Sequence, residues 1–186
     1  IGEDWREFSL DLAPFESVFF LEAADCRDRQ PASVPSSSGQ TIRQLMIENV
    51  VGVSGATAKE YPRFTAQTDI KALGGAAESA ILRGFSGTLR YDLSFDLAGD
   101  LPEKAQIELC DDCEAVELWL NGLPLGARIC PPYRFAIPRG LRIGENLLRI
   151  ELTNTLAEQL GDNEFDRSAA LGPVGLSGPV MLTIWT

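Results

Sequence analysis

The chain has 186 residues, of which 45% are hydrophobic, and this is enough to bury one sizeable core. Its 27 acidic residues outnumber 16 basic ones, and the net charge of -11 repels nucleic-acid phosphates and anionic lipid, so we expect no nucleic acid and no membrane surface as partners. Neutral partners such as sugars remain compatible with this charge, and no apolar run reaches the length of a transmembrane helix.

The N-terminal residues are predicted to hold one strand and a linker. The apolar run at residues 18–21 predicts a buried strand. The run CRDRQPASVPSSSGQT, residues 26–41, is rich in Ser and Pro and has no apolar periodicity, which is typical of a surface loop. We therefore divide the chain into residues 1–40, a strand and linker that can belong to a preceding domain, and residues 41–186, the main domain.

The first part of the main domain alternates between strands and a helix-like connection. Residues 45–53 predict one strand, and residues 63–68 predict a weaker one. Residues 69–83 contain helix formers but are split by a Gly-Gly pair, so a short helix or an irregular connection is expected. Residues 88–97 then alternate without an error, and the residues predicted to face the core are Leu89, Tyr91, Leu93, Phe95 and Leu97.

The second part of the main domain is predicted to be a series of strands joined by turns. Ile107 and Leu109 mark a strand that leads into the sequence CDDC, and residues 116–120 alternate between apolar and other side chains. Asn121-Gly122 predicts a tight hairpin turn, because both residue types tolerate positive φ. A second turn at residues 144–146 opens another alternating strand, and residues 180–185 form the last one. We interpret the turn residues Asn121, Gly122, Gly144 and Asn146 as explained by backbone geometry alone.

These elements predict the fold class. About nine strands, hardly any helix and no repeated βα pattern indicate an all-β protein, and specifically an antiparallel β-sandwich. The long connections favour a jelly roll over a meander.

Five segments, taken in order, carry a resemblance to a known family. FSGTLRYDLSF, VELWLNGLPLG, PPYRFAIPRGL, GENLLRIELTNT and GLSGPVMLTIW together resemble the sugar-binding, galactose-binding-domain-like jelly roll of glycoside hydrolase family 2 and related large bacterial glycosidases. The match covers roughly the last hundred residues. The resemblance implies an accessory domain beside a catalytic barrel, with neighbouring domains as its partners. It also implies that a segment such as WREFSLDLAPFESVFFLEAA, residues 5–24, closes the sandwich domain before it.

Several kinds of chemistry lack the residues they need. There is no histidine, which removes the commonest general base and excludes His-dependent triads. The four cysteines are expected to be reduced structural thiols, with a zinc site, a redox pair and a Cys110 to Cys130 disulfide as alternatives. We expect no metal site and no cofactor, although the acidic loop GDNEFD at residues 161–166 offers oxygen ligands for a structural calcium ion.

Glycoside hydrolysis needs two carboxylates about 5 to 10 Å apart, one of them with a raised pKa. The acidic residues at the CDDC turn and in the 161–166 loop are expected to be solvated, so no catalytic residue is assigned. These candidates are Asp111, Asp112, Glu114, Asp162, Glu164 and Asp166.

Sugar binding needs an exposed aromatic ring flanked by polar groups. Trp119 with Glu117, and Tyr133 with Arg134, are the candidate carbohydrate-binding residues; Trp185 is a further aromatic candidate. For Trp119 we favour an indole packed against a neighbouring strand or domain over an exposed indole that stacks on a sugar, because a large indole is seldom left exposed. For Tyr133, plugging the end of the sandwich is an equal alternative.

The leading hypothesis is a non-catalytic accessory domain of a glycoside hydrolase, with a structural role and a neutral glycan as a candidate ligand. A free-standing carbohydrate-binding module and a glycosidase that uses surface carboxylates are the alternatives. The chain begins at Ile1 and IGEDWREF is no signal peptide, so we expect a fragment or a processed chain. A secreted or cell-surface location is favoured over a cytoplasmic one.

Overall fold

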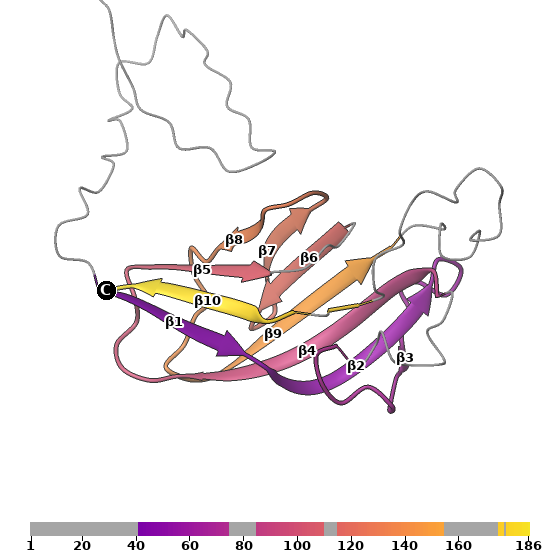
Figure 1. Ribbon diagram of the computed structural model, residues 1–186, viewed down its shortest axis with the longest axis horizontal. Coiled ribbons are helices and arrows are strands. Elements are labelled where there is room, and N and C mark those ends of the chain that lie inside the picture. The colour runs from indigo at the N-terminus through magenta and orange to yellow at the C-terminus, as the bar shows by residue number, and fades with distance from the viewer. Residues whose placement is uncertain (1–40, 75–84, 110–114, 155–174, 177) are drawn as a thin grey trace, which may run out of the picture.

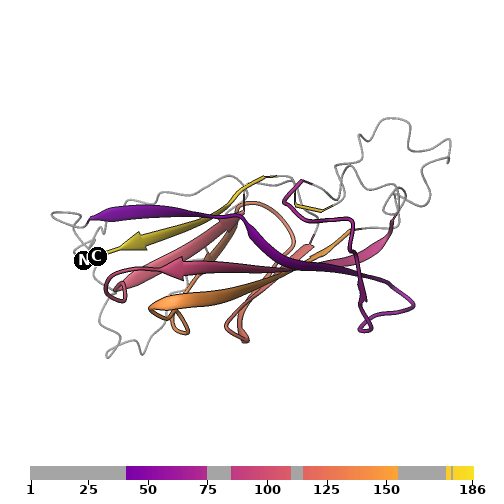
Figure 2. The ribbon, with the colours of Figure 1, turned by 90° about the horizontal axis from the view of Figure 1, so that it is seen from below.

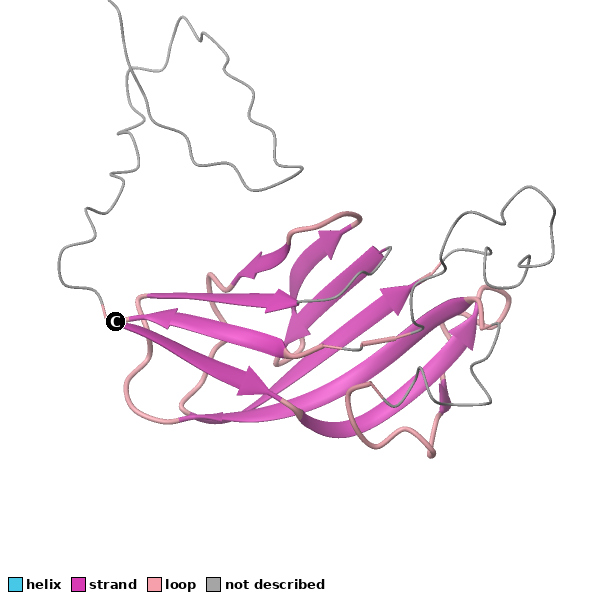
Figure 3. Ribbon diagram, in the orientation of Figure 1, coloured by secondary structure: helices cyan, strands magenta, loops and turns pink. Residues whose placement is uncertain are grey.

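The computed structural model describes residues 41–74, 85–109, 115–154, 175–176 and 178–186. These residues form strands joined by loops and contain no helix (Figure 3). The strand predicted at residues 18–21, the linker, the CDDC turn and the loop at residues 161–166 lie outside the described residues. Within the described part, no helix has the length and apolar character needed to cross a bilayer.

The described strands form two antiparallel sheets that are stacked face to face (Figures 1 and 2). The four-stranded sheet has the order β1 (Ile42–Ile47), β10 (Val180–Trp185), β5 (Lys104–Leu109) and β8 (Tyr133–Ala136). The six-stranded sheet has the order β3 (Thr65–Ala66), β2 (Asn49–Thr57), β4 (Gly87–Leu97), β9 (Gly144–Thr153), β6 (Ala115–Leu120) and β7 (Leu123–Arg128).

The connections repeatedly pass from one sheet to the other. β4 lies in the six-stranded sheet, β5 in the four-stranded sheet and β6 in the six-stranded sheet again, and β7, β8 and β9 repeat this exchange. A simple meander would keep consecutive strands beside each other, whereas these crossings belong to a jelly roll. The predicted all-β antiparallel sandwich is confirmed.

The core lies between the sheets and follows the predicted alternation. In β4, Leu89, Tyr91 and Leu93 are at most 2% exposed, and in β6 the inward residues are Val116, Leu118 and Leu120, all at 0%. Burying a side chain of this size contributes about 1.5–3 kcal/mol to stability, so the period-two pattern determines which face of each strand turns inward.

The strand predicted at residues 45–53 is wrong in one respect, because the structure has two strands there. β1 pairs with β10 in one sheet, and β2 pairs with β4 in the other, so the chain changes sheets at Glu48. Strands that switch sheets form the corners of sandwiches, and their apolar pattern continues through the corner. The predicted strand at residues 63–68 is reduced to the two residues of β3.

The hairpin after β6 has the predicted turn. Asn121 has φ 49° and Gly122 has φ 81°, and this pair of positive angles is the geometry of a type I′ turn. Asn146, by contrast, is not explained by backbone geometry alone. It is 0% exposed, and its side chain bonds Asn121, Arg142 and Gly144, so it is a buried structural residue at the start of β9.

The two ends of the described domain lie side by side. The Thr41 N–H donates to the Thr186 carbonyl at 2.8 Å, and the Thr186 N–H donates to the Thr41 carbonyl at 3.1 Å. Residues 41 and 186 therefore lie at one corner of the sandwich, where β1 begins and β10 ends (Figure 1).

Candidate functional site

A pocket of about 580 Å³ lies at one end of the six-stranded sheet. It opens where β4 and β6 begin and where β7 and β9 end, and the loop after β2 supplies a further wall. Most of its sheet residues, among them Thr88, Glu117 and Glu151, lie on the outer face, opposite to the core. The volume is within the range of about 300–1,000 Å³ that is typical of small-molecule sites.

The floor of the pocket is hollow because its side chains are small. Thr88 and Thr153 are cross-strand partners, and their hydroxyl oxygens are 2.8 Å apart in a hydrogen bond. Ala115 on β6 is the cross-strand partner of Thr153, and Ala127 on β7, which is the partner of Glu117, also lines the pocket. Larger side chains, among them Tyr61, Glu117 and Glu151, also line the pocket.

Asn154 holds the first residues of β4 against the end of β9. Its Nδ2 donates to the Phe85 carbonyl at 2.8 Å, and its Oδ1 accepts from the Gly87 N–H at 2.8 Å. Gly87 approaches β2 so closely that a Cβ there would lie 2.3 Å from the Ala56 carbonyl oxygen. This side of the pocket is therefore built by one amide side chain and one position that only glycine fits.

A buried carboxylate near the floor is neutralised by arginine. Both Nε and Nη2 of Arg90 bond Oε1 of Glu151, at 2.8 and 2.7 Å, and the Glu151 side chain is only 7% exposed. The Arg90 guanidinium also lies over the Phe64 ring, 3.6 Å from its centroid. The pair is a charge-assisted, fixed part of the sheet surface.

Glu117 is the second carboxylate of the pocket and has a different environment. It is exposed, and its cross-strand partner is Glu151, so two acidic side chains lie directly opposite each other. Like charges in this position are destabilising unless something compensates them. Arg90 neutralises Glu151, but Glu117 has no hydrogen bond or ion pair within the part of the chain that the structure describes.

Tyr61 stands at the rim and is 52% exposed. The turn that carries it is closed by Thr57, whose carbonyl accepts from the N–H groups of Glu60 and Tyr61, both at 2.9 Å. The Thr57 hydroxyl and N–H in turn donate to the Glu60 carboxylate at 2.8 and 3.1 Å, and these two bonds hold the pKa of Glu60 below its ordinary value. The Tyr61 ring packs edge-on against Phe64 at 5.8 Å.

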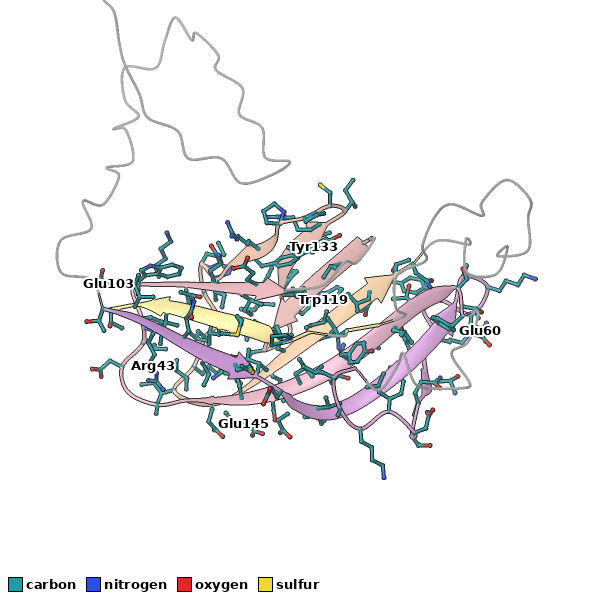
Figure 4. The ribbon with its side chains drawn as sticks, in the orientation of Figure 1. Arg43, Glu60, Glu103, Trp119, Tyr133 and Glu145 are labelled. Atoms are coloured by element: carbon teal, nitrogen blue, oxygen red, sulfur yellow. The ribbon has the colours of Figure 1, made fainter. Side chains whose placement is uncertain are left out.

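The four sequence-predicted sugar residues do not converge. Glu117 lines the pocket, and Trp119 lies one row away on the same face, partly buried between its register neighbours Pro124 and Arg149. Tyr133 and Arg134 are on β8 in the other sheet (Figure 4).

The two β8 residues differ in exposure. Tyr133 is 2% exposed and is part of the hydrophobic core. Arg134 is exposed and pairs with Glu108 at 2.9 Å. Trp185 is partly buried beneath the Lys104 ammonium, 4.8 Å from the ring centroid.

Sequence reasoning missed Tyr61, Thr88, Thr153 and Asn154. The alternation of β4 and β9 does assign Thr88 and Thr153 to the outer face, and this signal could have marked them as surface hydroxyls. Tyr61 precedes residues 63–68, where the sequence predicts only a weaker strand, and nothing local indicates that its loop lies next to the start of β4 and the end of β9.

Other predicted chemistry is partly outside the described residues. The candidate acids at residues 111–114 and 162–166 lie there, as do Cys26, Cys110 and Cys113. Cys130 is exposed and free. Among the residues that are described, no three Cys, Asp or Glu side chains are grouped as metal ligands.

Comparisons with known proteins find similarity to parts of large glycosidases. No family model matches the chain. A curated protein of Formosa agariphila named "Putative beta-glucuronidase" is 29% identical over 92 residues, which is 48% of this chain and 8% of that protein.

Solved structures extend the likeness to the fold. A rhamnosidase from Novosphingobium sp. PP1Y aligns with a TM-score of 0.59 and 24% identity, over 77% of this chain and 15% of that one. A β-glucuronidase from Ruminococcus gnavus has a TM-score of 0.51 and 13% identity, over 78% of this chain and 29% of its own. The chain thus has the fold of one part of these glycosidases and spans only a small share of their length.

Proposed function

We propose that this chain is a non-catalytic β-sandwich domain of a larger glycoside hydrolase, where it packs against neighbouring domains and binds carbohydrate. The observation that carries the proposal is the partial match: the sequence likeness covers 8% of a much longer protein named as a glucuronidase. A domain that occupies so little of a glycosidase leaves most of that chain for the catalytic machinery.

The two carboxylates of the pocket support a non-catalytic role. Glu117 and Glu151 are cross-strand neighbours, which superficially resembles the closely spaced acid pair of a retaining glycosidase. Glu151, however, is held by two nitrogen atoms of Arg90 and is nearly inaccessible, so it can neither attack a sugar nor donate a proton to one. Glu117 alone cannot supply both roles.

The outer face of the four-stranded sheet supports the structural role. Ile42 and Met46 on β1 are 61% and 50% exposed, and their cross-strand partners there are Trp185 and Met181. Both ends of the domain leave at this sheet, beside Ile42, so a domain linked through either end is tethered next to an apolar surface.

A panel of aryl glycosides, including a glucuronide, a galacturonide and a rhamnoside, tests the non-catalytic assignment. We expect the purified 186-residue chain to release no aryl alcohol, while an unrelated active glycosidase in the same buffers turns over its substrate. Turnover that is lost in Glu117→Gln or Glu151→Gln protein would refute the assignment. So would turnover that is lost on replacing Asp111, Glu114 or Glu164.

The reading frame around the chain distinguishes an accessory domain from a free-standing carbohydrate-binding module. An adjoining barrel with paired carboxylates is expected for the accessory domain. A frame that contains only this domain and a secretion signal would instead favour the free-standing module.

A further inference from the structure

The pocket at the end of the six-stranded sheet also indicates which sugars it accepts. Resting on the proposed function, we infer that this pocket binds a neutral sugar and rejects uronic acids. Tyr61 is the stacking surface, and Glu117 is the acceptor for the sugar hydroxyls.

Tyr61 has the properties of a sugar platform. Half of the side chain is open to solvent at the pocket rim, while Phe64 supports its ring edge-on and Thr57 fixes its backbone. A ring held in this way loses little conformational freedom on binding, and its apolar face matches the C–H face of a pyranose. Trp119, the larger aromatic on this sheet face, is partly buried and does not line the pocket.

Glu117 supplies unused hydrogen-bonding capacity. Its carboxylate has two acceptor oxygens and no partner within the described residues, although it faces a second acidic side chain across the strands. Sugar hydroxyls are donors, and two adjacent hydroxyls can bond both oxygens of one carboxylate. The exposed Glu117 carboxylate is thus available to bind a ligand at this pocket.

The charge around Glu117 determines which sugars are accepted. Arg90 forms an ion pair with Glu151, so these two residues together add no net charge to the floor of the pocket. The Arg128 guanidinium lies 5.2 Å from the centroid of Phe135, a core ring of the other sheet, so this side chain points toward that sheet. Its Nη1 donates to the Ala127 carbonyl.

Among the described residues, Glu117 is therefore the charge on the outer sheet face of the pocket that no ion pair compensates. Arg128 also lines the pocket and has no ion pair, but its cross-strand partner is the core residue Val116 and it lies over Phe135, on the inner face. A uronate carboxylate placed beside Glu117 meets like-charge repulsion, on a chain whose net charge is already -11. This repulsion alone favours neutral sugars over uronic acids, and no further contact with the sugar is needed.

The test is a titration of the 186-residue chain, followed by amide chemical shifts and calorimetry. The ligands are neutral di- and trisaccharides of glucose, galactose, xylose and rhamnose, and the corresponding glucuronic and galacturonic acid oligosaccharides. We expect at least one neutral ligand to bind, with shifts at Thr88, Glu117 and Thr153. The matching uronic acid ligand should bind at least about tenfold more weakly.

Two variants and a matched control separate the pocket from other surfaces. Tyr61→Ala and Glu117→Gln should each weaken binding of the neutral ligand about tenfold or more, and Glu117→Gln should reduce the discrimination against uronic acids. Glu145→Gln makes the same charge change on the same sheet, at the end away from the pocket (Figure 4), and should leave binding unchanged. Circular dichroism and thermal melting check that each variant is folded.

The opposite results would overturn the inference. These are no binding by any neutral ligand, equal binding of neutral and uronic sugars, or affinity that survives both Tyr61→Ala and Glu117→Gln. The absence of binding by every ligand, neutral and uronic, would also refute the carbohydrate-binding part of the proposed function, whereas the other results overturn this inference alone. The aryl glycoside assay tests the non-catalytic assignment separately.

Discussion

Nδ2 of Asn121 donates to Oδ1 of Asn146 at 2.9 Å, and this bond joins the hairpin turn after β6 to the turn that opens β9. The same Asn146 oxygen accepts from the Arg142 N–H, and the Asn146 Nδ2 donates to the carbonyls of Arg142 and Gly144. Asn121 also accepts from the Leu147 N–H at 2.9 Å. Two turns that look independent in the sequence are one hydrogen-bonded unit.

Replacing Asn146 is expected to destabilise the domain strongly. Asn146→Ala removes a fully buried amide that bonds the Asn121 side chain and the backbone of Arg142 and Gly144, which should lower the free energy of unfolding by about 2–4 kcal/mol. Urea denaturation measures the change. Asn49→Ala is the control, because Asn49 is exposed and its bond to Ser94 should contribute less than about 1 kcal/mol. Equal losses in the two variants would contradict the proposed role of the network.

Gly87→Ala is expected to disrupt the start of β4. The added Cβ would lie 2.3 Å from the Ala56 carbonyl oxygen and 2.8 Å from Thr57 Cα, and both are backbone atoms that cannot rotate away. We expect a loss of more than about 2 kcal/mol in unfolding free energy, measured by thermal melting. Gly52→Ala on the neighbouring strand is the control, since its Cβ meets nothing within 4 Å. A Gly87→Ala protein as stable as Gly52→Ala would refute the close approach.

The Glu60 turn is expected to weaken in acid. The hydrogen bonds from Thr57 lower the pKa of Glu60 from 4.5, so the folded state favours the charged carboxylate. The stability that Glu60 contributes is therefore present above pH 4.5 and is lost as the pH falls through the lowered pKa. An NMR titration of the Glu60 carboxyl carbon should show this lowered value. In Thr57→Val protein the pKa should rise toward 4.5, and an unchanged value there would contradict the assigned cause.

Trp119 distinguishes packing from ligand binding. Because its indole is partly buried, Trp119→Ala should lower the unfolding free energy by about 2–3 kcal/mol, less than the loss for a fully buried ring. Affinity for a neutral glycan should stay the same, since Trp119 does not line the pocket. Thermal melting and the glycan titration measure the two effects. A stable variant that has lost glycan affinity would make Trp119 the platform in place of Tyr61.

Local patterns were sufficient to predict the strands and their inward faces. The alternation around Leu89, Tyr91 and Leu93 is a property of the extended backbone itself, because neighbouring side chains point to opposite sides. The Asn121-Gly122 turn is likewise determined by the φ angles that these two residues accept. Such features depend on residues that are close together in the chain, so they are visible before any folding.

Which distant residues meet was decided only by the tertiary structure. The change of sheet at Glu48, the burial of Asn146 and the approach of the Tyr61 loop to Glu117 all depend on strand pairing between segments far apart in sequence. The alternation within a strand does not show which other strand it pairs with. Any strand of similar pattern can bond the same backbone groups and bury the same face. The pocket therefore arises from the order of strands in the sheet, which is set by the packing of the whole sandwich.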